Sequence, residues 1–407
     1  MNLPNGTFRS LRGFNYRVWW GGALVSNIGT WMQRTAQDWI VLTELTHHDA
    51  AAVGIVMGLQ FGPQFVLLPF TGYVADRFDK RKLLMATQSA QGLLALGLGL
   101  LTLAGWVHLW HVYVFALLLG CVSAFDAPAR QTFVSQLVGD EHLSNAVALN
   151  STSFNAARMI GPAVAGLMIA GVGTGVVFVL NALSFGAVLC SLRMLRPHEF
   201  HERASGPARR GGLVDGFRHA WEQPDLRTVL VMFFLIGTFG INFPIYISAM
   251  SVSVFHVGAG QFGLLTSAMA IGSVTGALLS AQREKPRMAW LLSGALAFGT
   301  ALTAAAVMPS YALFAVALFF VGLSTQTFTT TAHGAAQLWS DPSLRGRVIA
   351  IVMAVSVGGT PLGAPLLGMI ANHFGPRWSL VAGGASGFLA LLVGLHGRAR
   401  YSRLQTR

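Results

Sequence analysis

Long apolar stretches recur along the whole chain, and they limit its fold more than any other feature. A helix that crosses a bilayer needs about 20 mostly apolar residues. The chain holds twelve such stretches, at 17–42, 51–75, 82–104, 109–127, 146–170, 173–193, 226–250, 260–281, 287–306, 310–331, 346–372 and 377–396. Only 10% of its 407 residues are charged, whereas soluble proteins average about 25%. The sequence therefore predicts an all-α integral membrane protein with twelve transmembrane helices, which excludes a soluble enzyme, a disulfide scaffold and a disordered protein.

The basic residues are confined to alternate loops. The chain has 27 Lys and Arg against 15 Asp and Glu, which gives a net charge of +12. With the N-terminus inside, 24 of the 27 basic residues lie on one side, Arg377 lies outside, and Arg34 and Arg158 fall within spans. An excess of Lys and Arg marks cytoplasmic loops. We therefore expect both termini to be cytoplasmic and no nucleic acid to bind, because a nucleic-acid site would gather the charge in one domain.

A polar segment at 194–225 divides the chain into two halves. Its second part, 213–221, has apolar residues at helical spacing, which predicts a short amphipathic helix on the inner leaflet. Gln136–Leu143 resembles Gln337–Leu344, 201 residues further on, so span five corresponds to span eleven and the halves are parallel repeats. The expected domains are a six-helix bundle at 1–193, the linker at 194–225, a second six-helix bundle at 226–397 and a basic cytoplasmic tail at 398–407.

The loop between the second and third spans carries a spaced motif. Its residues are Gly72, Asp76, Arg77, Lys80 and Arg81. The spacing resembles the G-x-x-x-D-R-x-x-[RK]-[RK] signature of the major facilitator superfamily; an ordinary basic inner loop is the alternative. In that family the arginine pairs with an acid at the cytoplasmic end of the fourth helix. The resemblance thus implies that Arg77 pairs with Asp126, close to Arg130, in a conformational switch.

Span five holds a second motif, formed by Arg158, Gly161, Pro162 and Gly166. It is similar to the G-x-x-x-G-P-x-x-G-G motif of antiporters in the same superfamily, with Ala in place of Gly at 157 and 165. Small residues let helices approach closely, and proline bends a helix. The resemblance implies export by an antiporter, and a kink without transport function is the alternative.

One face of the first span is polar. On a helix, Asn27, Trp31, Arg34 and Asp38 fall within about 60° of each other, and Arg34 and Asp38, at i and i+4, can pair. Among the fifteen acids, Asp38 alone lies well inside a span. A carboxylate held beside a cation in low dielectric can take up and release a proton. Asp38 and Arg34 are therefore candidates for proton coupling, and a structural ion pair near the outer surface is the alternative.

Further polar side chains occur inside the spans. Arg158 could bind an anionic substrate or form a structural pair. Together the polar residues indicate a water-accessible substrate cavity, although each one alone also suits helix packing. The cavity candidates are Asn27, Trp31, Gln60, Gln64, Arg158, Asn242, Tyr246, Gln326 and Thr330. We expect no metal site and no cofactor.

Three segments narrow the resemblance to one branch of the superfamily. Asn27–Trp39, Phe125–Gln131 and Asn145–Ser151 look like the branch that includes the bacterial enterobactin exporter. This implies a proton-driven antiporter in the bacterial inner membrane that exports a siderophore or an amphiphilic drug by alternating access. Its expected partners are a small-molecule substrate, protons and membrane lipids, and we expect a monomer without enzyme activity. The alternatives are an importer or facilitator of the same fold and, in a different class, a lipid-moving or enzymatic membrane protein.

Overall fold

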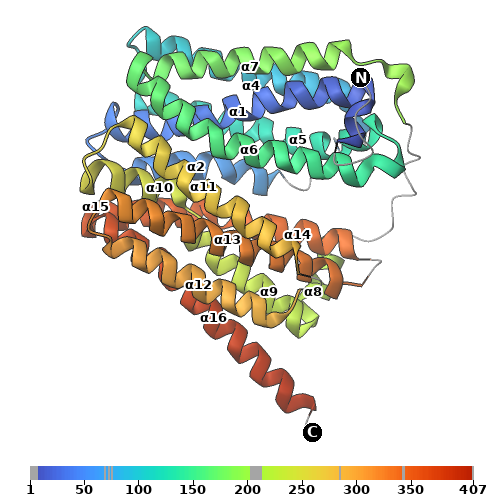
Figure 1. Ribbon diagram of the computed structural model, residues 1–407, viewed down its shortest axis with the longest axis vertical. Coiled ribbons are helices and arrows are strands. Elements are labelled where there is room, and N and C mark those ends of the chain that lie inside the picture. Colours follow the sequence, from blue (N-terminus) through green and yellow to red (C-terminus); the bar gives the residue numbers. More distant parts are fainter. Residues whose placement is uncertain are drawn as a thin grey trace. The chain divides into compact units, whose positions relative to one another are not determined.

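The computed structural model describes residues 8–67, 70–71, 74, 77–201, 213–283, 286–341 and 344–405. Over these residues the regular structure is helical (Figure 1). The α-helices are α1 (Phe14–Thr43), α2 (Ala50–Val66), α4 (Lys80–Leu103), α5 (Leu109–Leu137), α6 (Asp140–Val172), α7 (Thr174–Met194), α8 (Leu213–Glu222), α9 (Pro224–Leu235), α10 (Phe243–Ala249), α11 (Ala259–Ala281), α12 (Met288–Val307), α13 (Tyr311–Trp339), α14 (Arg345–Gly358), α15 (Thr360–Phe374) and α16 (Pro376–Gln405). Two short 3₁₀ turns, Arg9–Arg12 and Pro197–Glu199, and two π-helical turns, Ile236–Gly240 and Met250–Val254, complete the set.

Ten helical segments of the described residues are long and apolar enough to cross a membrane. They are Lys80–Leu103, Leu109–Leu137, Glu141–Val172, Thr174–Met194, Pro224–Val254, Ala259–Ser280, Met288–Val307, Tyr311–Trp339, Arg347–Phe374 and Pro376–Gly397. α2 is apolar but only 17 residues long. α1 has 30 residues, but polar side chains such as Gln33, Arg34, Gln37 and Asp38 lower its hydropathy. The chain is a multi-pass membrane protein.

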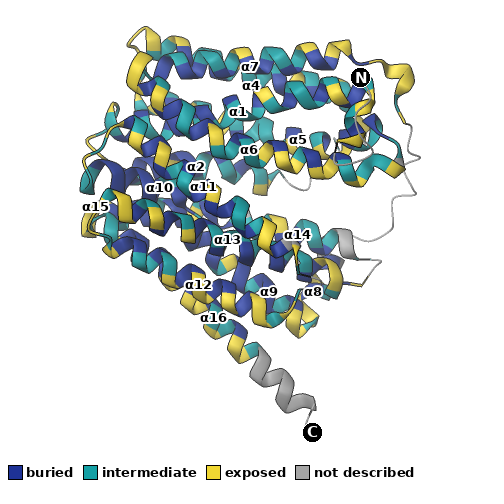
Figure 2. Cartoon of the chain, viewed as in Figure 1, coloured by how far each residue is buried: buried dark blue, intermediate teal, exposed yellow. Residues whose placement is uncertain are grey.

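The long helices carry large apolar side chains on their outer faces. Figure 2 shows buried and exposed positions side by side along most helices. Leu93 of α4, Leu167 of α6 and Leu392 of α16 are each more than 60% exposed. In water such a surface would aggregate, whereas lipid tails are as apolar as leucine. The exposed leucines are therefore the lipid-facing surface that the low charge content predicts.

Contacts along the chain divide it into two compact units. Unit 1 comprises Met1–Leu45, Gly62–Ala208 and Ala259–Ser267, and unit 2 comprises Thr46–Phe61, Arg209–Gly258 and Ala268–Arg407. Each unit is built mainly from one half of the sequence and takes in a short segment of the other half. The expected domain boundaries at 193 and 226 were drawn between sequence repeats, not between compact units. The division into two six-helix bundles at these residues remains a prediction.

In unit 1, α1 packs against α6 and α7, and α7 packs against α4 (Figure 1). Buried aromatic side chains fill one end of these contacts, where Trp19 meets Phe133 edge to face at 6.5 Å. The hydroxyl of Tyr16 donates to the carbonyl of Ala146 at 2.7 Å, and the indole N–H of Trp20 donates to the carbonyl of Leu149 at 3.2 Å. Because a buried polar group without a partner is costly, these two bonds hold α1 in one register against α6.

In unit 2, α12 packs against both α13 and α16. Glycines allow the closest of these approaches: a methyl group at Gly387 of α16 would lie 2.7 Å from the backbone nitrogen of Gly299 in α12. Without a hydrophobic driving force between helices in lipid, close backbone packing is the main source of helix association. The glycines thus stabilise the α12–α16 pair through their lack of a side chain.

Candidate functional site

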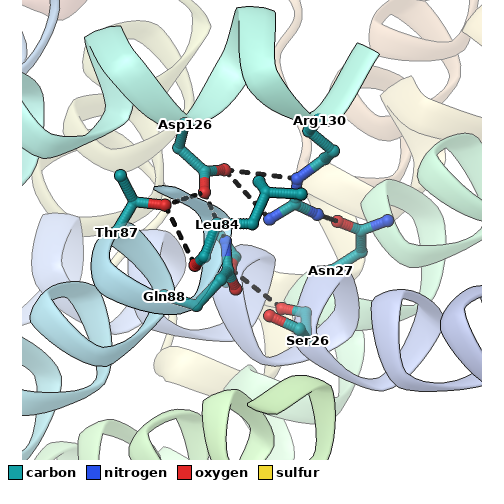
Figure 3. A network of polar contacts seen from close by, with 8 residues as sticks. Ser26, Asn27, Leu84, Thr87, Gln88, Asp126 and Arg130 are labelled. Atoms are coloured by element: carbon teal, nitrogen blue, oxygen red, sulfur yellow. Dashed lines mark hydrogen bonds and ion pairs between the residues drawn. The ribbon is translucent and has the colours of Figure 1, made fainter. Parts of the chain in front are cut away.

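A buried carboxylate in α5 joins three helices of unit 1 (Figure 3). Asp126 is 6% exposed and forms an ion pair with Arg130, one turn further along α5, with Nη2 and Oδ2 3.1 Å apart. From α4, the Thr87 hydroxyl and the Gln88 amide donate to Oδ1 at 2.6 and 2.7 Å. Arg130 also donates to Oδ1 of Asn27 in α1 at 3.2 Å. Each charge in the network therefore has an opposite charge and hydrogen bonds, which buried ions require.

This network adds a partner to one expected pair. The resemblance implied that Arg77 pairs with Asp126; the structure shows an ion pair between Asp126 and Arg130, and the pairing with Arg77 remains a prediction. Arg77 itself is exposed, and Gly72 and Asp76 lie outside the described residues. The i, i+4 spacing of Asp126 and Arg130 brings the two side chains together on one face of α5. The role of the motif as a conformational switch remains a prediction.

Arg81, one of the basic residues of the motif, binds the end of a neighbouring helix, a role that the sequence did not indicate. Arg81 donates from Nε to the carbonyl of Leu192 at 2.8 Å and from Nη2 to that of Arg193 at 3.2 Å. The last carbonyls of a helix have no partner within it, so Arg81 satisfies the end of α7. Asp79 accepts the backbone N–H of Lys82 at 2.7 Å, which makes it the N-cap of α4.

A second cluster surrounds Trp31 on the polar face of α1. The guanidinium carbon of Arg34 lies 4.9 Å from the centroid of the indole ring, and that of Arg158, from α6, lies 5.9 Å from it. Both distances are within the range of cation–π contacts. Phe154, one turn before Arg158, meets Trp31 edge to face at 5.7 Å. The structure thus brings Arg158 to Trp31 and Arg34, which the sequence had placed on one face of the first span.

Gly161 of α6 makes this arrangement possible. A methyl group there would lie 2.6 Å from Cβ of Trp31 and 3.1 Å from the carbonyl oxygen of Ile28. A larger residue would therefore push α6 away from α1. The same glycine belongs to the antiporter-like motif, so the motif positions Trp31 against α6.

The charges of the cluster do not balance. The carboxylate of Asp38 attracts Arg34, and the positive charges of Arg34 and Arg158 repel each other. All three side chains are partly buried. Two arginines and one carboxylate together carry one net positive charge when Asp38 is ionised.

The rest of the antiporter-like motif packs against the beginning of α11. A methyl group at Gly166 would lie 2.5 Å from the carbonyl oxygen of Ala259, and one at Gly263 would overlap the carbonyl of Pro162. Ser267 donates to the carbonyl of Met159 at 2.7 Å. Within unit 1 these small residues support the packing interpretation, and a role in antiport remains a prediction.

Asn242 and Tyr246, the polar residues expected in the seventh span, form hydrogen bonds at a break in a helix of unit 2. The helix is interrupted at Ile241 and Asn242, because Pro244 has no N–H to donate and its ring would clash with the carbonyl of Gly240, four residues earlier. The amide of Asn242 donates to the carbonyl of Thr238 at 2.7 Å, and the hydroxyl of Tyr246 donates to that of Phe239. Both side chains are buried and satisfy carbonyls that the break releases.

The remaining cavity candidates are distributed over both units. Gln60, Gln326 and Thr330 lie in unit 2 and Gln64 lies in unit 1. The amide of Gln326 donates to the hydroxyl of Thr330 at 3.1 Å, within α13. Their role in a substrate cavity remains a prediction.

Sequence reasoning missed three residues of these two clusters. Thr87 and Gln88 were absent from the candidates, although two adjacent polar residues in the apolar stretch 82–104 were a usable signal. Phe154 gave no such signal, because an aromatic residue in an apolar helix is ordinary. Its place against Trp31 depends on how α6 is rotated about its axis.

Comparisons with known proteins agree with this architecture. The family model described as transmembrane secretion effector (MFS_3) matches residues 5–404. The chain is similar to the staphyloferrin A transporter of Staphylococcus aureus, with 28% identity over 86% of this chain and 87% of that protein. It is 27% identical to the multidrug efflux pump Tap of Mycolicibacterium fortuitum, over 88% and 90% of the two chains. It is 26% identical to the enterobactin exporter EntS of Escherichia coli, over 87% and 84%.

A solved structure shares the fold. The bacterial homologue of the human lysosomal transporter Spinster, in an inward-facing and unoccupied conformation, superposes with a TM-score of 0.75 at 15% identity. The match covers 94% of this chain and 96% of that one.

Proposed function

Because the chain belongs to the transmembrane secretion effector family of the major facilitator superfamily, we propose that it is a secondary active transporter that exports a siderophore or an amphiphilic drug-like molecule. The observation that carries this proposal is the match of nearly the whole chain to that family. Relatives named as an efflux pump and an exporter favour export over import. We further propose that transport proceeds by alternating access in a bacterial inner membrane and is driven by protons.

The proposed topology has twelve spans with both termini in the cytoplasm. Ten spans are the apolar segments described above, and the other two are α1 and α2, at the positions where the sequence predicts spans. Ionisable residues inside a membrane face the protein interior or a water-filled cavity. The polar face of α1 therefore suits a helix that borders the transport pathway, and its low hydropathy is a consequence of that position.

We propose Asp38 as the group that couples proton movement to export. It lies on the polar face of α1, and its charge is attracted by Arg34. An antiporter must bind its proton and its substrate in alternation, so each must change the affinity for the other. Asp38 interacts with Arg34, and Arg34 interacts with Arg158, so a change in the charge of Asp38 changes the electrostatic field at both arginines.

Transport into proteoliposomes tests the proposal. The purified full chain is reconstituted, a pH gradient is imposed, and the uptake of staphyloferrin A, enterobactin and a cationic dye is followed. The wild type should concentrate at least one of them against its gradient. Asp38→Asn keeps the shape and most hydrogen bonds, so it should abolish pH-driven accumulation while downhill exchange continues.

The matched control is Asp225→Asn, which changes an exposed acid in the first turn of α9 and should transport like the wild type. Accumulation by Asp38→Asn under a pH gradient alone would show that another acid couples transport, with Asp126 the next candidate. A wild type that moves no substrate under either sign of the gradient would contradict proton-driven export.

A further inference from the structure

We infer that Arg34 and Arg158, which share Trp31 as a neighbour, bind an anionic oxygen group of the transported molecule, a carboxylate attached to an apolar or aromatic body. This inference rests on the proposed function and names the chemical class of its substrate. It follows from the charge, the geometry and the apolar lining of the cluster around Trp31.

The charge balance is the first observation. Of the fifteen acids in the chain, only Asp38 and Asp126 fall within the predicted spans, and Asp126 is paired with Arg130. The predicted spans therefore contain one further acid, Asp38, and the cluster around Trp31 contains two arginines, Arg34 and Arg158. Charged residues inside a membrane are expensive and are kept where they bind ions or substrates. A single anion at this cluster would bring its net charge to zero.

The geometry is the second observation. Arg34 and Arg158 come from different helices and lie 4.9 and 5.9 Å from the same indole ring, and their charges repel each other. A cation–π contact stabilises a guanidinium without cancelling its charge. An oxyanion near both guanidiniums would remove the repulsion. Arginine is suited to this because its planar fork donates two parallel hydrogen bonds to one carboxylate.

The apolar lining is the third observation. Phe154 stands edge to face with Trp31 at 5.7 Å, one helical turn before Arg158 in α6. Two aromatic side chains beside two cations offer a contact surface to the uncharged part of the same ligand. A free inorganic anion would use only the arginines, whereas an organic acid would contact both parts. The cluster thus favours an organic acid.

Equilibrium binding to the purified full chain in detergent tests the inference independently of transport. The probe is radiolabelled 2-naphthoate, and the competitor is 2-naphthamide, which has the same ring without the charge. We expect naphthoate to bind at micromolar to millimolar concentrations and naphthamide to compete at least about tenfold more weakly, since hydrogen bonds to charged groups account for a difference of this size.

Variants locate the site. Arg158→Gln should weaken naphthoate binding about 10- to 100-fold. Arg158→Lys keeps the charge without the fork and should recover part of the affinity. Arg193→Gln changes an exposed arginine at the end of α7 and should bind naphthoate like the wild type.

Three results would overturn the inference: no naphthoate binding to the wild type, equal competition by naphthamide, or full affinity in Arg158→Gln. The first two comparisons use the wild type alone, so they hold even when the Arg158 variants fail to fold. Binding of naphthoate by a protein that transports nothing would contradict the proposed function and leave the site intact. Normal export with unchanged binding in Arg158→Gln would contradict the site and leave the proposed function intact.

Discussion

α1 and the segment Pro224–Val254 begin the two predicted halves of the chain, but the polar groups that they contain are of different kinds. α1 is one continuous helix of 30 residues with Asn27, Arg34 and Asp38 on one face. The segment in unit 2 has no charged residue after Arg227, and it is broken at Asn242 with π-helical turns on both sides of the break. Polarity thus comes from charged side chains in unit 1 and from irregular backbone in unit 2.

The difference between these two segments indicates in which unit side chains can bind protons and anions. Non-helical backbone at membrane depth is tolerated only where it is buried in protein or lines a cavity, and π-helical turns often occur at functional sites. A broken helix offers carbonyl dipoles and a point of bending. It cannot gain or lose a proton as a carboxylate can. Titration and anion binding are therefore expected in unit 1, and adjustment of the backbone in unit 2.

The largest effect is expected where unit 1 buries a charge pair. Asp126→Ala removes the acceptor of Arg130, Thr87 and Gln88 and leaves a partly buried cation without its counter-charge. The loss of stability should be about 2–4 kcal/mol, below the full cost of breaking a buried pair, measured by the unfolding midpoint of the purified protein in detergent. The double variant Asp126→Ala/Arg130→Ala should recover part of the loss. Wild-type stability in Asp126→Ala would mean that the network does not hold α1, α4 and α5 together.

A smaller effect is expected from adding one methyl group at matched glycines. Gly161→Ala of α6 would collide with Trp31 in unit 1, and Gly363→Ala of α15 with the backbone of Thr238 in unit 2. Each should cost about 1–3 kcal/mol, but only Gly161→Ala should also weaken naphthoate binding. Gly186→Ala, whose added methyl meets no atom within 4 Å, is the control and should leave both measurements unchanged. If the Gly161 and Gly363 variants lost naphthoate affinity equally, anion binding could not be assigned to unit 1 alone.

The smallest effect is expected at the break in unit 2. Tyr246→Phe removes the hydroxyl that donates to the carbonyl of Phe239 and keeps the ring. The cost should be about 0.5–1.5 kcal/mol in the same unfolding measurement, with pH-driven accumulation retained. If this variant had normal stability but lost pH-driven accumulation, unit 2 would also take part in proton coupling.

Several features could be predicted from the sequence because they depend on local composition and period. Long apolar stretches are sufficient for a multi-pass helical protein, since an apolar segment of about 20 residues crosses lipid as a helix that satisfies its backbone hydrogen bonds within itself. The spaced motif around Arg77 was sufficient for the superfamily, and the family match confirms it. The polar face of α1 also follows from helical spacing alone.

The partners of the buried charges were decided by tertiary structure. Asp126 and Arg130 are one turn apart and could have been paired from spacing, whereas the pairing of Asp126 with Arg77, which the family pattern implied, remains a prediction. Thr87 and Gln88 reach Asp126 only because α4 faces α5 with those residues turned inward. Phe154 and Arg158 reach Trp31 only because Gly161 lets α6 approach α1. Spacing along a helix determines which residues share a face, whereas the rotation and closeness of two helices, set by packing all along their contact, determine which faces meet.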